Sequence, residues 1–120
     1  MAPAYAVAEI LQDTGLGLQE FDYYEIHEAF AAQVLSNLQA WGSKKFADEH
    51  LSGAEPIGEV PDEKLNPRGG SIALGHPFAA TGARLVHQAL RELEEKGKNT
   101  ALVSICAAGG LGATAILERS

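Results

Sequence analysis

Near its C-terminus the chain reads ALVSICAAGGLGATAIL, residues 101–117. Leu102 to Ile105 is almost wholly apolar, which is typical of a strand buried on both faces of a sheet. Closely spaced glycines then predict a tight turn, and Ala113 to Leu117 predicts a last strand. Because the connection is short and rich in glycine, we expect these two strands to pair antiparallel.

Outward from this hairpin, apolar residues at helical spacing predict three helices. Their stripes are Ala4, Val7, Ala8 and Leu11; Ala31, Val34, Leu35 and Leu38, continuing to about Trp41; and Ala83, Val86, Leu90 and Leu93. Gly15 and Gly17 end the first helix and Gly97 ends the third, where glycine is common. Phe21 to Ile26 is aromatic and β-branched and predicts a short strand.

Residues 43–70 mix charges with three prolines and a Gly69-Gly70 pair, which predicts a long loop with room for one short helix. The order is therefore helix, strand, helix, loop, helix, strand, strand. This order predicts an α/β fold with a mixed sheet and helices packed against it, forming one domain over residues 1–120. Because no strand precedes the first helix, we expect a piece of a longer parent protein.

Composition excludes several classes of protein. Hydrophobic residues make up 46% of the 120 residues, which favours a folded single domain. The net charge of -7 offers no basic patch for a nucleic acid and no polybasic membrane anchor. No apolar run is long enough for membrane insertion, and the N-terminus lacks signal-peptide features. The single cysteine, Cys106, fits a reducing compartment, either a bacterial cytoplasm or an organelle matrix.

The first candidate site is IHEAFAA, residues 26–32, at the junction of a predicted strand and helix. Ligands of α/β domains usually bind where strands end, so His27 and Glu28 are well placed to act. The same pair also fits a capping histidine followed by a carboxylate that the helix dipole favours, and both interpretations stay open. A zinc-protease motif is excluded because Ala31 stands where the second histidine would be.

The second candidate site is GGSIALGHP, residues 69–77. Glycines let a backbone approach a ligand closely, and Pro77 fixes the chain directly after His76. A histidine held in this way is suited to act as a general base. The alternative is a glycine-rich turn that carries an incidental histidine.

The third candidate site is CAAGGLG, residues 106–112. A cysteine at the end of a buried strand is often a small core residue, but the glycine turn exposes backbone N–H groups that can form an oxyanion hole. GLGATA, residues 110–115, also fits the dinucleotide fingerprint, which must open a helix inside a βαβ unit. Only five residues follow Ala115, so we reject a nucleotide site.

In this order, the three segments resemble the thiolase family closely. Thiolases carry Asn-Glu-Ala-Phe-Ala, Gly-Gly-x-Ile-Ala-x-Gly-His-Pro and Cys-x-Gly-Gly-x-Gly segments, and the resemblance spans essentially the whole chain. His27 stands where most thiolases have Asn, and Ala108 stands where most have Gly. These two differences resemble the branch that forms the thiolase β subunit of the fatty-acid β-oxidation trifunctional complex.

The resemblance implies transfer of acyl groups between 3-ketoacyl-CoA or acetyl-CoA and CoA, with CoA thioesters as substrates and neither a cofactor nor a metal. It implies that His76 deprotonates a nucleophilic cysteine and that Cys106 is the acid/base at the α-carbon of acetyl-CoA. The backbone N–H of Ala108 would be one oxyanion-hole donor. His27 would take the place of the Asn that positions a water.

The resemblance also implies that Phe30 and Gly109 line the substrate pocket. The family's acylated cysteine and most of its CoA-binding region lie in the N-terminal half, so we expect this chain alone to be inactive. Expected partners are that N-terminal half, further copies in a homo-oligomer, and the hydratase/dehydrogenase α subunit. Two alternatives stay open: a Cys-His thioester hydrolase with Cys106 as nucleophile, and a non-catalytic assembly domain.

Overall fold

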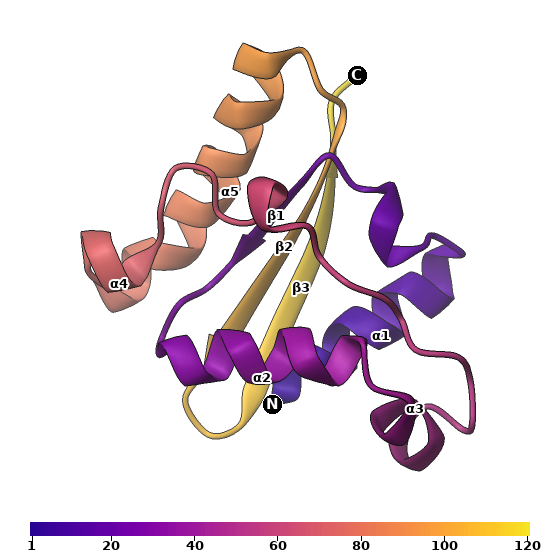
Figure 1. Cartoon of the computed structure of the whole chain (residues 1–120). Helices are drawn as coiled ribbons and strands as arrows, with labels where there is room; N and C mark the ends of the chain where they lie inside the picture. The colour runs from indigo at the N-terminus through magenta and orange to yellow at the C-terminus, as the bar shows by residue number, and fades with distance from the viewer.

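A three-stranded sheet organises the chain, and the computed structural model describes all of residues 1–120 (Figure 1). The strands are β1 (Tyr23–Ile26), β2 (Thr100–Ala107) and β3 (Leu111–Glu118), in the order β1-β2-β3. β1 runs parallel to β2, and β2 runs antiparallel to β3. The predicted α/β fold, the mixed sheet and the antiparallel final pair are therefore confirmed.

Helices cover both faces of this sheet (Figure 1). The long helices are α1 (Ala2–Thr14), α2 (Ala31–Trp41) and α5 (Phe78–Lys96); the short elements are η1 (Leu18–Glu20), α3 (Lys44–His50), η2 (Asp62–Lys64) and α4 (Ser71–Leu74). α1 and α2 pack on one face and α5 packs on the other. No helix combines the length and the apolar character needed to cross a lipid bilayer.

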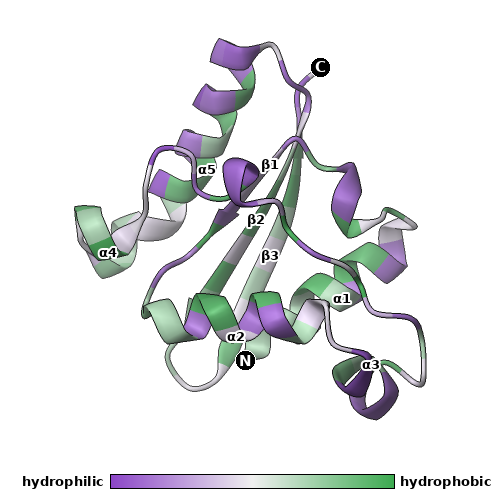
Figure 2. Cartoon of the chain, in the orientation of Figure 1, coloured by the Kyte–Doolittle hydropathy of each residue, from purple (hydrophilic) through white to green (hydrophobic).

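β2 is buried on both faces, as its run of apolar residues predicts. Leu102 packs with α1 and α2 in the larger core, which also contains the buried indole of Trp41. Ala101 and Val103 point to the opposite face and pack against α5. Figure 2 shows the hydrophobic character of β2 and β3 between these layers. The central strand thus joins two separate cores, which fixes α5 relative to the other two long helices.

β2 and β3 are longer than predicted, and three further differences concern α5, β1 and α4. α5 begins at Phe78, ahead of its apolar stripe, because Pro77 suits the start of a helix. β1 begins at Tyr23, two residues later than predicted, although Asp22 still binds the start of β2: its N–H donates to the Thr100 carbonyl, and its carboxylate accepts the N–H groups of Asn99 and Thr100. The third difference is α4, a single helical turn inside a segment predicted as a turn.

The connection between β2 and β3 is short because glycine permits its backbone geometry. Gly109 and Gly110 have φ values of 83° and 75°, which L-residues with side chains rarely adopt. Gly112 has a different requirement: a Cβ there would lie 2.9 Å from the backbone carbonyl carbon of Ala2 and the nitrogen of Pro3. The first turn of α1 therefore rests directly on the backbone of β3.

Glu25 is the least expected residue of the core. It lies on β1, is 0% exposed, and neither of its carboxylate oxygens has a hydrogen-bond partner. Burial raises the pKa of Glu25 to about 7, and the nearby Glu92 carboxylate adds to this, while Arg84 opposes it. Ionising such a carboxyl inside the protein opposes folding.

We expect Glu25→Gln to change how stability depends on pH. The folded chain retains a proton on Glu25 that the unfolded chain releases between about pH 4.5 and 7, so the free energy of unfolding of the wild type falls as pH rises through this range. The variant lacks this loss, so its free energy of unfolding relative to the wild type should increase by about 3 kcal/mol between pH 4.5 and pH 8. Urea unfolding at both pH values measures the difference.

The exposed Glu63 supplies the control, since Glu63→Gln should follow the wild type at both pH values. A constant difference between Glu25→Gln and the wild type across the range would mean that the carboxyl ionises in the folded state as easily as in the unfolded state.

Candidate active site

Parallel pairing of β1 and β2 brings two of the predicted site residues together. Ile26 is the register partner of Ser104, and the N–H of His27 donates to the Ser104 carbonyl at 2.8 Å. Cys106 follows two residues further along β2. The Nδ1 atom of His27 lies 3.6 Å from the Cys106 sulfur and 3.4 Å from the Cys106 carbonyl oxygen. His27 and Cys106 thus form a direct pair at the C-terminal edge of the sheet.

His76 reaches the same edge from the N-terminal end of α5. Its Nδ1 atom lies 2.6 Å from Thr81 Oγ1, and the Thr81 hydroxyl donates its only proton to the Pro77 carbonyl at 3.1 Å. With its proton on the Pro77 carbonyl, Thr81 accepts a hydrogen bond from Nδ1–H, and the Nε2 lone pair of His76 is then free to take a proton. The rings of His76 and His27 are 4.4 Å apart, measured between centroids.

The electrostatic setting favours a neutral His27. Its side chain is 3% exposed, and Nε2 has no hydrogen-bond partner. Burial lowers the pKa of His27, as do the nearby His76 and Arg84, whereas the hydrogen bond to the Cys106 carbonyl acts in the opposite direction. A neutral imidazole can both donate and accept a hydrogen bond, which an imidazolium cannot do.

These three residues face one cavity of about 780 Å³. Its walls are largely apolar and include Ala29, Phe30, Phe78, Ala79, Ile105 and Leu111. Phe30 and Phe78 are 74% and 87% exposed, so the mouth of the cavity carries bare aromatic rings. An apolar cavity with a few convergent polar groups is the usual form of a small-molecule site.

The β2–β3 connection forms another part of the cavity wall. Ala108 and Gly110 line the cavity, while Gly109, which the sequence places in the pocket, does not. The backbone N–H of Ala108 makes no hydrogen bond within the chain. Such a group beside a reactive side chain can donate to a developing oxyanion.

Sequence reasoning missed two contributions to this site. Thr81 fixes the His76 tautomer, and only its position within the first turn after Pro77 could have indicated this. Met1, Ala2 and Pro3 also line the cavity, and nothing in their residue types suggests it. Glu28, in contrast, is absent from the cavity wall, because its carboxylate accepts hydrogen bonds from Asn66 and from the Ile72 backbone.

No group of three or more potential ligand side chains is placed to hold a metal ion.

Comparison with known proteins places the chain in a family. The family model described as "Thiolase, C-terminal domain" matches residues 1–119. The 3-ketoacyl-CoA thiolases of Photobacterium profundum and Colwellia psychrerythraea are each 52% identical over 118 residues, which is 98% of this chain. The chain spans 27% of the length of these curated relatives.

Solved structures show the same relationship. An acetyl-CoA acetyltransferase from Syntrophomonas wolfei superposes with a TM-score of 0.79 at 33% identity, covering 98% of this chain and 27% of that one. The peroxisomal 3-ketoacyl-CoA thiolase of Saccharomyces cerevisiae superposes with a TM-score of 0.75 at 42% identity, covering 98% of this chain and 29% of that one. That yeast enzyme is described as a five-layered structure built from two core domains of identical topology.

We expect His27 to titrate below pH 6.5 in a ¹H–¹⁵N NMR titration, because burial disfavours its imidazolium form. The exposed His87 serves as a reference in the same sample. Cys106→Ala should leave this behaviour in place, since the variant keeps the backbone carbonyl at position 106. A midpoint above 6.5 that falls in Cys106→Ala would instead reveal an imidazolium–thiolate pair.

Proposed function

Because this chain belongs to the thiolase family, as its C-terminal domain, we propose that it supplies the proton-transfer groups for acyl transfer between 3-ketoacyl-CoA and CoA. In this proposal His76 is the base for a nucleophilic cysteine, and Cys106 is the acid/base at the α-carbon of acetyl-CoA. The nucleophilic cysteine comes from an N-terminal thiolase half, since Cys106 is the only cysteine in this sequence.

The observation that carries the proposal is the meeting of His27, His76 and Cys106 at one apolar cavity. These residues are far apart in the sequence, and the cavity gives a CoA thioester a place beside all three. The free Nε2 lone pair of His76 and the half-buried thiol of Cys106 are two separate proton carriers. A reaction with two proton transfers at different atoms needs two such groups.

In the degradative direction, His76 Nε2 removes the proton of the nucleophilic thiol, and the resulting thiolate attacks the C3 ketone of 3-ketoacyl-CoA. The C2–C3 bond then breaks, leaving the acyl group on the nucleophile and the electron pair on C2 of an acetyl-CoA enolate. Cys106 Sγ–H gives its proton to C2, which releases acetyl-CoA. Covalent catalysis of this kind divides one difficult step into two easier ones.

The second half of the reaction returns both groups to their initial state. The Cys106 thiolate takes the proton of incoming CoA, whose sulfur attacks the acyl carbonyl. The nucleophile leaves as a thiolate and recovers its proton from His76. The backbone N–H of Ala108 is suited to stabilise an enolate oxygen, and neutral His27 can hold a water that donates to the other oxyanion.

We also propose that the parent protein belongs to the β-oxidation branch of the family. His27 in place of Asn and Ala108 in place of Gly support this, as does the 52% identity to proteins named 3-ketoacyl-CoA thiolase. The exposed rings of Phe30 and Phe78 fit a face that an N-terminal half covers. A homo-oligomer and a hydratase/dehydrogenase α subunit are the further partners in this proposal.

One geometric observation favours a second function. The Cys106 sulfur lies 3.6 Å from His27 Nδ1, the arrangement that a Cys-His thioester hydrolase would use. In that reaction Cys106 itself would carry the acyl group, and no second cysteine would be needed. The two functions therefore differ in which sulfur is acylated.

We expect the chain alone to show no thiolysis of acetoacetyl-CoA by CoA, and a supplied N-terminal thiolase half to restore it. In the restored protein, Cys106→Ala and His76→Gln should each lower turnover about 10³-fold, because each removes a proton carrier. A coupled assay of acetyl-CoA formation measures this. His87→Gln, at an exposed position on α5, is the matched control and should retain full turnover.

Mass spectrometry of the chain after incubation with acetoacetyl-CoA separates the two functions. An acyl adduct on Cys106, with hydrolysis that Cys106→Ala abolishes, would contradict the thiolase assignment and support the hydrolase.

A further inference from the structure

The segment that carries His76, residues 66–76 and here called the histidine loop, cannot hold its shape by apolar packing. Its single helical turn, α4, leaves Ile72 and Leu74 62% and 56% exposed, and Figure 2 shows α4 in the hydrophobic colour at the edge of the molecule. One turn of helix is not stable in isolation. The three glycines of the loop also increase the conformational entropy that is lost when it becomes ordered. Contacts with the rest of the chain must therefore fix it.

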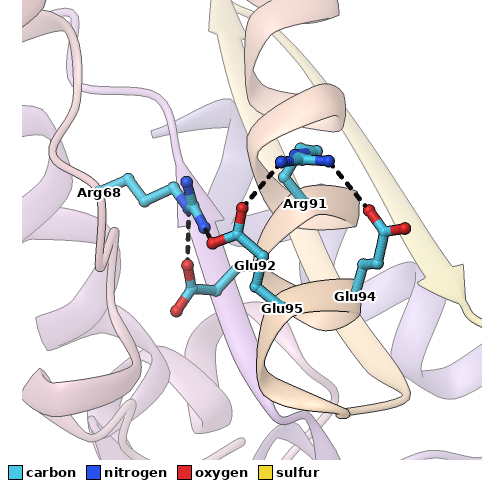
Figure 3. Close-up of polar contacts among 5 residues, drawn as sticks. All are labelled: Arg68, Arg91, Glu92, Glu94 and Glu95. Atoms are coloured by element: carbon cyan, nitrogen blue, oxygen red, sulfur yellow. Dashed lines mark hydrogen bonds and ion pairs between the residues drawn. The ribbon is translucent and has the colours of Figure 1, made fainter.

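Polar side chains of α5 provide most of these contacts. Arg84, Gln88 and Glu92 are spaced four residues apart and so lie along one side of the helix. Gln88 Nε2 donates to the Gly69 carbonyl at 3.2 Å. Arg68 donates through Nε to Glu92 at 2.6 Å, and it also pairs with Glu95 (Figure 3). These bonds hold the beginning of the histidine loop against α5.

Arg84 holds the other end, next to His76 itself. Its Nη1 donates to the Gly75 carbonyl at 2.9 Å, and its Nη2 donates to Ser71 Oγ at 2.8 Å. The Arg84 guanidinium therefore links Ser71, the first residue of α4, to Gly75, the residue directly after α4. The Gly75 carbonyl belongs to the peptide group that enters His76, and Gly75 has a φ of 91° that depends on glycine. Fixing this peptide group fixes where the His76 Cα and ring begin.

Glu28 anchors the loop from the side of β1. Its carboxylate accepts from Asn66 Nδ2 at 2.8 Å and from the Ile72 N–H at 3.2 Å. Gly70 lies against this carboxylate so closely that a Cβ at position 70 would overlap it. Asn66 also exchanges two hydrogen bonds with the backbone of Ile26 at the end of β1. The loop is thus held between α5 and the strand end that carries His27.

We propose that Arg84 is a positioning residue for His76. It does not line the cavity, so it acts through the Gly75 peptide group and not on a substrate. Its planar guanidinium reaches two acceptors at a fixed separation, which the single ammonium of a lysine cannot do. The consequence for turnover rests on the thiolase function proposed above, whereas the consequence for the His76 ring does not.

The test uses the full chain and observes the His76 ring and the amides of α4. Arg84→Ala should shift the His76 ring ¹⁵N signals, which report the Nδ1–H tautomer held by Thr81. It should also speed hydrogen exchange about tenfold at Leu74 and Gly75, whose N–H groups bond within the loop. Added guanidinium ion at non-denaturing concentration should restore both signals, and ammonium ion should not.

Two further variants complete the experiment. Arg84→Lys should show a smaller effect at the same amides, since it keeps the charge but reaches only one acceptor. Lys96→Ala is the matched control, because Lys96 is an exposed cation on the same helix and has no hydrogen bond or ion pair with the histidine loop. This variant should change neither the His76 ring signals nor hydrogen exchange at Leu74 and Gly75.

The role is refuted if Arg84→Ala leaves the His76 ring signals unchanged. Faster exchange spread evenly along α5, which guanidinium does not correct, would also refute it by assigning Arg84 to general stability. In a protein completed with an N-terminal thiolase half, Arg84→Ala should lower kcat about 10- to 100-fold with a much smaller change in KM. Absence of turnover in the wild type would refute the thiolase function while leaving the ring signature to decide the role of Arg84.

Discussion

The parallel pairing of β1 with β2 is the constraint on which the rest of the structure depends. Parallel strands end at the same edge of a sheet, so the register that pairs Ile26 with Ser104 also brings His27 to the carbonyl of Cys106. The two strands are separated by more than 70 residues, and that intervening chain supplies α2, the histidine loop and α5. α5 packs across both strands, so its N-terminal end, with His76, reaches the same edge.

Much of the fold follows from the sequence because the relevant signals are local. Helical spacing predicts α1 and α2, and the apolar run of β2 predicts a strand with helices on both sides. Element ends are harder, because contacts from elsewhere in the chain decide them. Just ahead of β1, the Asp22 carboxylate accepts the N–H groups of Asn99 and Thr100, and no local pattern shows this.

The candidate site also contains some residues that the sequence reveals and others that it does not. His76 and Cys106 stand out because each lies beside a glycine turn, and His27 stands out because it follows a predicted strand directly. The groups that orient them do not stand out: Thr81 looks like an ordinary first-turn residue, and Arg84 looks like a solvated charge on an amphipathic helix. Their roles depend on which groups lie within hydrogen-bond distance of them, the His76 ring for Thr81 and the Gly75 carbonyl for Arg84. Glu28 is the opposite case. The sequence places it beside His27 and suggests a reactive role, but in the structure its carboxylate anchors the histidine loop.

The contact between α1 and Gly112 bears on how this protein tolerates change. Gly112 is exposed by the usual measure, and exposed positions are ordinarily free to vary. Here the backbone of Ala2 and Pro3 fills the place of its missing side chain, while the strand register sets Gly112 opposite Cys106. A mutational scan should find position 112 closed to every other residue. The first turn of α1 therefore restricts which residue can stand opposite Cys106, although the two segments lie at opposite ends of the sequence.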